Sequence, residues 1–111
     1  MATKTDPNLA EIKRTYRLLD DNFDTIYSAC DDDQKKALIT ARDAARDAFW
    51  KAVAEDLTDN HDLVAHTLEE LQDTNDQIDK DLKKLEDVSE ILETVTQAVK
   101  LAAALAVLAA A

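Results

Sequence analysis

The stretch that decides the fold is residues 61–111, which read HDLVAHTLEELQDTNDQIDKDLKKLEDVSEILETVTQAVKLAAALAVLAAA. Its apolar side chains recur every seven residues, at Val64, Leu71, Ile78, Leu85, Leu92 and Val99. The same stripe also contains Leu68, Leu82, Val95 and Ala102, each three or four residues after one of these positions. A seven-residue repeat of this length predicts one extended helix with a coiled-coil seam. We therefore expect a continuous third helix over residues 60–110.

The two halves of this stretch differ in charge. Exposed positions from His61 to Glu90 are mostly acidic, whereas residues 101–111 contain no polar side chain. At a rise of ~1.5 Å per residue the helix would span roughly 75 Å, while the two preceding helices would each span only about 33–40 Å. The apolar half is then expected to extend beyond the helices that cover the acidic half.

Three arrangements would cover the apolar half. We favour pairing with a second copy or a protein partner. The second arrangement is a break near Glu86 and Asp87 that folds the helix back to give four similar helices, and Asp87 and Glu90 have the spacing of a capping box. Against a break, the seven-residue phase runs through this point, where no Gly, Pro or Asn occurs. The third arrangement is entry into a membrane or a partner's groove.

The composition indicates an all-α protein. The chain has 111 residues, which is one domain at most, and it has no glycine and a single proline. β-hairpins and phosphate-binding loops depend on glycine, so both are disfavoured. The fold class we predict is a helical bundle or coiled coil, with two shorter amphipathic helices packed against one long C-terminal helix. We expect residues 1–111 to form this single domain.

The two shorter helices are predicted over residues 7–30 and 33–58, after a disordered tail at 1–6. Asp6 and Pro7 form a strong helix start. The first helix carries an apolar stripe at Leu9, Ile12, Tyr16, Leu19, Phe23, Ile26 and Cys30. The second has an alanine-rich face and a second apolar face, which suggests neighbours on both sides. Within it we expect Trp50 to be a core anchor more readily than an interface anchor.

Net charge, cysteine usage and the first residues limit which partners and which cellular location we expect. The net charge of −11 argues against nucleic acid, because phosphate binding needs a basic footprint. This negative charge is consistent either with a surface that keeps the chain soluble or with binding to a basic partner. Cys30 is the single cysteine, so no intramolecular disulfide forms, and we interpret it as a small apolar filler. The first residues lack an apolar signal segment, so a cytoplasmic location is expected, with membrane association or signal-independent export as alternatives.

The side chains that carry chemistry do not form a known site pattern. His61 and His66 are five residues apart, so the four-residue spacing of a zinc pair is absent. The acidic runs at 31–33 and 73–81 lack the glycine of a calcium loop. We expect no catalytic residue, metal or cofactor, and no enzyme activity. Asn75 falls on the seam, either as a buried residue that sets register or as an exposed kink.

The function we predict is non-enzymatic interaction through helical surfaces, as an assembly, adaptor, cognate-partner-binding, chaperone-like or immunity-like module. The partner would be a second copy or another protein. The candidate interaction residues are Leu92, Val95, Val99, Leu101, Leu105, Leu108 and Trp50. The alternative is a membrane-active protein with an acidic soluble stalk, which would contact lipid through residues 95–111. In outline this alternative is similar to α-helical pore-forming proteins, which keep an apolar helical segment hidden until they meet lipid.

Overall fold

The described residues of the computed structural model, 7–54 and 62–109, form five α-helices. They are α1 (Pro7–Asp21), α2 (Phe23–Ser28), α3 (Asp32–Ala54), α4 (Asp62–Lys84) and α5 (Val88–Leu108). The predicted all-α fold class is therefore confirmed. The predicted tail at 1–6, its cap at Asp6 and the end of the second helix at 55–58 lie outside the described residues.

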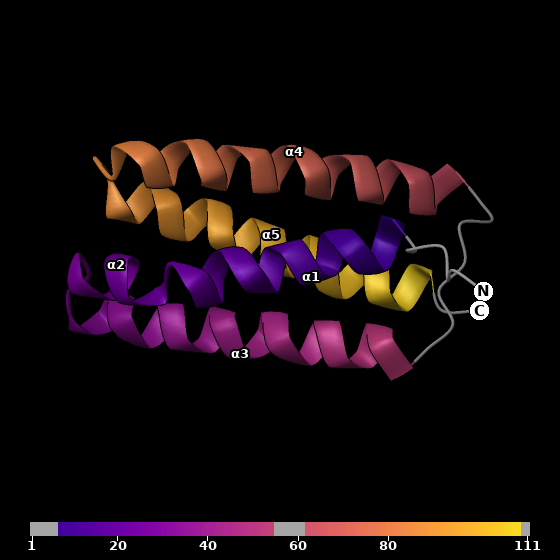
Figure 1. The fold of residues 1–111 in the computed structure, drawn as a ribbon, viewed down its shortest axis with the longest axis horizontal. Helices are drawn as coiled ribbons and strands as arrows, with labels where there is room; N and C mark the ends of the chain where they lie inside the picture. Colours follow the sequence, from indigo (N-terminus) through magenta and orange to yellow (C-terminus); the bar gives the residue numbers. More distant parts are fainter. Residues whose placement is uncertain (1–6, 55–61, 110–111) are drawn as a thin grey trace.

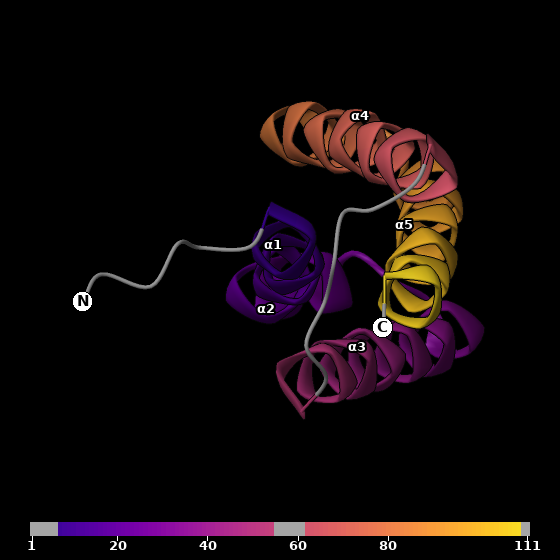
Figure 2. The same ribbon diagram turned by 90° about the vertical axis from the view of Figure 1, so that its right-hand side faces the viewer.

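The four long helices pack side by side as a bundle. Figure 1 shows that α1 and α4 run in one direction, and that α3 and α5 run in the other. Seen along the bundle in Figure 2, α4 and α3 lie on opposite sides of the pair formed by α1 and α5. The C-terminal helix α5 contacts α1, α3 and α4, so it is the element against which the rest of the chain packs.

The prediction of one continuous helix over 60–110 is wrong. α4 ends at Lys84 and α5 begins at Val88, and the two helices pack against each other as an antiparallel hairpin. The longest dimension of the molecule is 43 Å, which is too short for a single helix of roughly 75 Å. The fold-back arrangement, which we ranked second, is the one adopted. It lets α1, α3 and α4 of the same chain cover the apolar half.

Local interactions at residues 85–87 turn the chain. Leu85 donates its backbone N–H to the carbonyl of Asp81 at 2.8 Å and has a positive φ of 47°. Glycine usually occupies this position after a helix, and another residue there costs roughly 1–2 kcal/mol. Asp87 then caps α5, because its carboxylate accepts a hydrogen bond from the backbone N–H of Glu90 at 3.3 Å. The capping spacing noted in the sequence is thus used in the structure.

The predicted helix over 7–30 is divided into α1 and α2 at Asn22. The side-chain amide of Asn22 donates to the carbonyl of Leu18 at 2.8 Å, a local bond that competes with the helical backbone pattern. The apolar stripe nevertheless continues across the division, and Ile12, Leu19 and Ile26 are fully buried. The interruption therefore changes the local backbone and leaves the buried face intact.

The connection between α2 and α3 is fixed by reciprocal capping. Gln34 donates its backbone N–H to the carboxylate of Asp31 at 2.8 Å, and Asp31 donates its own N–H to the side chain of Gln34 at 2.9 Å. Asp32 and Asp33 occupy the first turn of α3, where their negative charge favours the helix dipole. The guanidinium of Arg42 lies 4.0 Å from the ring centroid of Phe23, which holds α2 against α3.

Candidate functional site

The predicted interaction residues of the C-terminal helix belong mainly to the core of the monomer. Val95 and Leu105 are fully buried, Leu92 and Val99 are nearly so, and Leu101 and Leu108 are partly buried. Our expectation that this stripe lies beyond the other helices is incorrect, whereas its contact with a second molecule stays a prediction. The hairpin places α5 between α3 and α4, so most of the stripe has no surface to offer a partner.

Trp50 also differs from its prediction, because it is exposed where burial was expected. Its neighbour Phe49 stacks against Tyr16 of α1, with ring centroids 6.0 Å apart, and so provides the aromatic contact between α1 and α3. Trp50 contacts Phe49 but remains 59% exposed. We predicted a core anchor, and the structure instead places this indole on the surface.

Most of the large exposed apolar side chains lie at one end of the bundle. Trp50 and Val53 are near the end of α3, Leu63 is in the first turn of α4, and Val107 is near the end of α5. The antiparallel topology brings these three helix ends to the same side of the molecule, at the right in Figure 1. Large apolar side chains that are exposed together mark sites of protein or membrane contact.

A shallow apolar groove runs along the outside of α3 and α5. It consists of two adjoining hollows of about 380 and 280 Å³, which share Ala44. Its alanines are Ala37, Ala41, Ala44 and Ala48 from α3, with Ala103 and Ala106 from α5. We call this feature the α3–α5 groove. Because its side chains are small, the backbone of a third helix can approach it closely.

The rim of the α3–α5 groove carries positive charge in a chain that is strongly acidic overall. Lys100 borders one hollow and Lys51 borders the other, together with Asp47. By contrast, α4 carries many more carboxylates than lysines. In Figure 2, α5 separates α4 from α3. The groove is therefore less repulsive to an acidic partner than the surface of α4 is.

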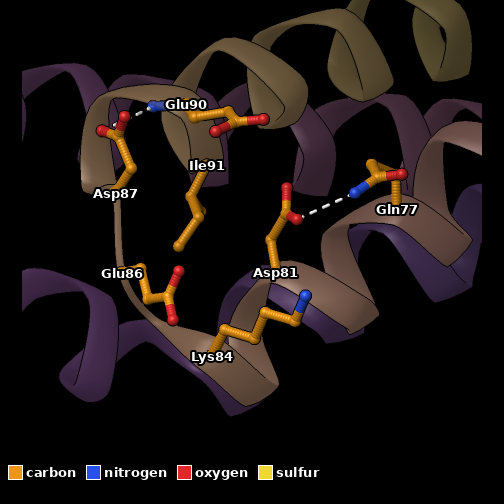
Figure 3. A pocket seen from close by; sticks show the side chains of 7 residues that line it. All are labelled: Gln77, Asp81, Lys84, Glu86, Asp87, Glu90 and Ile91. Carbon is orange, nitrogen blue, oxygen red and sulfur yellow. Dashed lines mark hydrogen bonds between the residues drawn. The ribbon is translucent and has the colours of Figure 1, made fainter.

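A polar hollow of about 290 Å³ lies at the turn between α4 and α5 (Figure 3). It is lined by Gln77, Asp81, Lys84, Glu86, Asp87, Glu90 and Ile91. Asp81 accepts a hydrogen bond from Gln77 at 2.8 Å, and Asp87 is engaged in capping α5. These carboxylates have structural roles at a helix turn, and Lys84 supplies a nearby positive charge.

The described histidine, His66, lies beside a carboxylate on an exposed helix face. His66 Nε2 lies 2.7 Å from a carboxylate oxygen of Glu70 on the exposed face of α4. His66 is exposed, whereas His61 lies outside the described residues. Among residues 7–54 and 62–109, no group of three or more His, Cys, Asp and Glu side chains is arranged to hold a metal ion.

The buried polar side chains that contact one another lie between α1 and α4. Asn75 is fully buried and donates to Thr15 Oγ1 and to a carboxylate oxygen of Glu11, both at 2.9 Å. Arg14 contacts the same Glu11 oxygen at 3.0 Å and Asp76 at 2.7 Å. Of the two interpretations of Asn75, the structure supports the buried residue that sets register. We call this set of five residues the α1–α4 polar network.

Hydrogen bonds within the α1–α4 polar network favour the charged form of Arg14. Burial opposes the charge of Arg14, but its hydrogen bonds to Asp76 and Glu11 outweigh that effect and raise the pKa of the guanidinium. Arg14 therefore compensates the nearly buried carboxylate of Glu11. A buried carboxylate without such a partner would strongly destabilise the fold.

Cys30 is a poor nucleophile in this structure. Burial, followed by the negative charge of Asp31, raises the pKa of its thiol, and the positive charge of Lys35 offsets only part of the rise. The Cys30 thiol also contacts the carbonyl oxygen of Ile26 at 3.1 Å. A protonated, partly buried thiol of this kind is a packing residue, in line with the sequence interpretation.

Comparison with known proteins adds no family: no family model, curated protein or solved structure matches this chain. The α3–α5 groove was not predicted as a site, although the alanine-rich face of the helix over 33–58 was its signal. Its second wall comes from α5, which the prediction of a continuous helix had placed elsewhere.

Proposed function

We propose that this chain is a non-enzymatic interaction module that binds a helix of a protein partner in the α3–α5 groove. The observation that carries this proposal is the groove itself. It is an apolar channel between two parallel helices, and the exposed side chain of Val107 stands at its edge. Amphipathic helices bind in apolar grooves of this kind through side chains spaced three and four residues apart.

The chemistry of the α3–α5 groove limits the partner. Its alanine walls favour a helix that presents small or medium apolar side chains. Lys51 and Lys100, one bordering each hollow, favour carboxylates on the flanks of that helix. Charge at such a rim contributes more to the association rate and to specificity than to affinity.

The test is site-specific photo-crosslinking in lysate of the source cells. A photoreactive amino acid at Ala103, an exposed position in the α3–α5 groove, should yield one discrete protein adduct. The same amino acid at Gln72, an exposed position on α4, is the matched control and should yield none. Ala44→Glu would place a large charged side chain where the two hollows meet and should abolish the Ala103 adduct.

Two results would count against this binding mode. One is equal crosslinking from Ala103 and Gln72, because it would indicate non-specific collision. The other is an Ala103 adduct that survives Ala44→Glu in a chain whose helical circular dichroism is unchanged. The partner would then contact α5 without occupying the groove.

A second candidate function is membrane activity, which one feature of α5 favours. By length and composition, Val88–Leu108 is a helix that could cross a membrane, although many of its side chains are buried in the bundle. The exposed apolar end described above lies where α5 ends. Insertion would require α5 to leave the bundle and expose the apolar faces of α1, α3 and α4.

Liposome flotation separates the two candidates. A membrane-active chain should float with anionic liposomes more strongly as the pH falls from about 7 to 5, because protonation of carboxylates reduces electrostatic repulsion. Val107→Glu should then reduce flotation. A chain that functions through the α3–α5 groove should remain unbound at both pH values, with or without this substitution.

A further inference from the structure

We propose that α5 passes between two copies of this chain, so that each copy completes its bundle with α5 of the other copy. In this dimer residues 85–87 become helical, and α4 continues into α5 as one long helix. The helices α1, α2, α3 and α4 of each chain stay together. The exchange does not depend on the binding of a partner helix in the α3–α5 groove, but it changes which chain supplies one wall of that groove.

The connections between the helices allow α5 to move as a unit. α3 ends and α4 begins at the same end of the bundle, so these two helices stay with one another. α4 ends and α5 begins at the opposite end, where residues 85–87 join them (Figure 1). Straightening residues 85–87 therefore carries α5 away from its own bundle and leaves the other helices in place.

The phase of the apolar repeat fits the joined helix. The buried residues that lie at multiples of seven from one another are Val64, Leu71 and Ile78 on α4, and Leu92 and Val99 on α5. A straight helix would present these two buried faces on one side. The dimer requires this agreement, because a two-fold axis perpendicular to the plane of the two long helices places α1 of both copies on the same side of them. A hairpin does not require it, because its two helices could have independent phases.

The conformation of the turn favours straightening. Leu85 has a positive φ of 47°, a backbone conformation that suits glycine and is costly for a leucine. Short connections under strain favour the exchange of an element between copies, because the extended form relieves the strain. Leu85 is only partly buried in the monomer, and in the dimer Leu85 of the two copies would meet at the two-fold axis. The extended form thus adds an apolar contact that the monomer lacks.

The contacts that hold α5 in the monomer can form again in a second copy. The buried side chains described for α5 are all apolar, so their contacts with α1, α3 and α4 are non-directional. A second copy presents the same three helix faces, and the two-fold axis places α5 antiparallel to α4 of that copy, as in the monomer. The α1–α4 polar network, whose hydrogen bonds fix the register of α4, stays within each chain.

The exchange gives the α3–α5 groove two owners. Its wall from α3, which includes Ala41 and Ala44, would come from one chain, and its wall from α5, which includes Ala103 and Ala106, would come from the other. The dimer would carry two such grooves. A partner helix bound in either groove would then contact both chains and hold the dimer together.

The experiment tests which chain supplies α5. Single cysteines are placed in separate batches of chain, in a Cys30→Ser background. One pair of batches carries Thr40→Cys and Thr96→Cys, exposed positions that line one hollow of the α3–α5 groove. Another pair carries Asp73→Cys and Gln97→Cys, exposed positions that line a hollow between α4 and α5. The two batches of each pair are mixed in urea, refolded together at high concentration and treated with a short bifunctional maleimide, without any partner protein.

Both pairs should give an adduct of twice the chain mass in the isolated dimer, and batches folded separately before dilute mixing should give none. The two hollows lie on different sides of α5, so a surface contact between two intact bundles cannot give both adducts. An adduct from one pair alone, or from neither, would overturn the proposal. A chain that stays monomeric after refolding at high concentration would overturn it as well. Because no partner helix is present, none of these results depends on whether the groove binds one.

A pair of substitutions at Leu85 tests the role of the turn. Leu85→Gly removes the cost of the positive φ and disfavours a straight helix, so the dimer fraction should fall at least tenfold. Leu85→Ala removes the same partly buried side chain but favours the helix, so the dimer fraction should equal or exceed that of the unmodified chain. If both variants reduce the dimer fraction equally, lost packing is responsible and the hinge role of Leu85 is refuted.

Discussion

Asn75 on α4 and Thr15 on α1 are joined by a hydrogen bond of 2.9 Å, and both residues are fully buried. The same Asn75 amide nitrogen lies 2.9 Å from the Glu11 carboxylate. A single asparagine on the apolar face of α4 thus aligns α4 with two successive turns of α1. Shifting α4 along α1 by one turn would leave all three polar groups buried without these partners, which fixes the register of the bundle.

We expect Asn75→Ala to lower the free energy of unfolding by about 2–3 kcal/mol, because it leaves Thr15 and Glu11 buried with fewer hydrogen bonds and creates a cavity. Urea denaturation followed by circular dichroism provides the measurement. Gln72→Ala, on the exposed face of the same helix, is the control and should change stability by no more than about 0.5 kcal/mol. Equal effects of the two substitutions would contradict the role assigned to the α1–α4 polar network.

Arg14→Ala should destabilise the fold more than Asp76→Ala does, although both remove the same ion pair. Arg14→Ala leaves the nearly buried Glu11 carboxylate without its positive charge, a change that typically costs about 1–3 kcal/mol. Asp76→Ala removes an exposed carboxylate and should cost less than ~1 kcal/mol. The comparison uses urea denaturation of the two variants, and the reverse order would show that Glu11 does not need Arg14.

Phe49→Ala and Trp50→Ala should separate the packed aromatic residue from the exposed one. Phe49 stacks on Tyr16, and its removal should cost about 2–3 kcal/mol, somewhat below the range for a fully buried Phe. Trp50→Ala should cost less than ~1 kcal/mol, because the indole is mostly exposed. Intrinsic fluorescence gives an independent check, since acrylamide should quench Trp50 in the folded chain nearly as well as in urea. A strongly protected indole would indicate that another copy covers it.

The alkylation rate of Cys30 should reveal its raised pKa. Burial and Asp31 disfavour the thiolate in the folded chain, so the rise of rate with pH should occur at higher pH than in urea-unfolded chain. The protonated thiol is the form that the fold favours, so its contribution to stability is present at neutral pH and is lost as the pH rises through the folded-state pKa. Iodoacetamide labelling between about pH 7 and 10 covers this range.

Asp31→Asn is the matched variant for the cysteine experiment. It retains an oxygen that can cap α3 and removes the negative charge that raises the pKa of Cys30. The alkylation profile should therefore move toward lower pH while the helical content is unchanged. Identical profiles for the folded and unfolded chains would refute the raised pKa.

The helices and their buried faces were predictable because the interactions that specify them are local. The three- and four-residue spacing of Leu9, Ile12, Tyr16 and Leu19 defines the inner face of α1 without reference to any partner. The acidic start of α3 and the capping spacing of Asp87 and Glu90 are likewise properties of a few adjacent residues. For Asn75 the seam position left burial and an exposed kink as alternatives, and the contacts with α1 decide for burial.

The surfaces of the bundle were not predictable, because each is made by two helices that are distant in sequence. The α3–α5 groove exists only where α5 lies beside α3, and the prediction of one continuous helix had separated those walls. Trp50 was assigned to the core because α3 has apolar side chains on two faces. In the bundle, α1 and α5 cover one side of α3, and Trp50 lies outside that contact.

The amino-acid sequence by itself determined an all-helical chain, its apolar stripes, its caps and the polar position on the seam. Only the tertiary structure decided between a straight α4–α5 helix and a hairpin. The seven-residue phase is the same in both forms, so periodicity cannot distinguish them. The hairpin forms because burying α5 against α1, α3 and α4 of the same chain outweighs the backbone strain at Leu85, with Asp87 capping the new helix. That balance depends on contacts between residues far apart in sequence, so the local capping spacing of Asp87 and Glu90 could indicate the break but could not decide it.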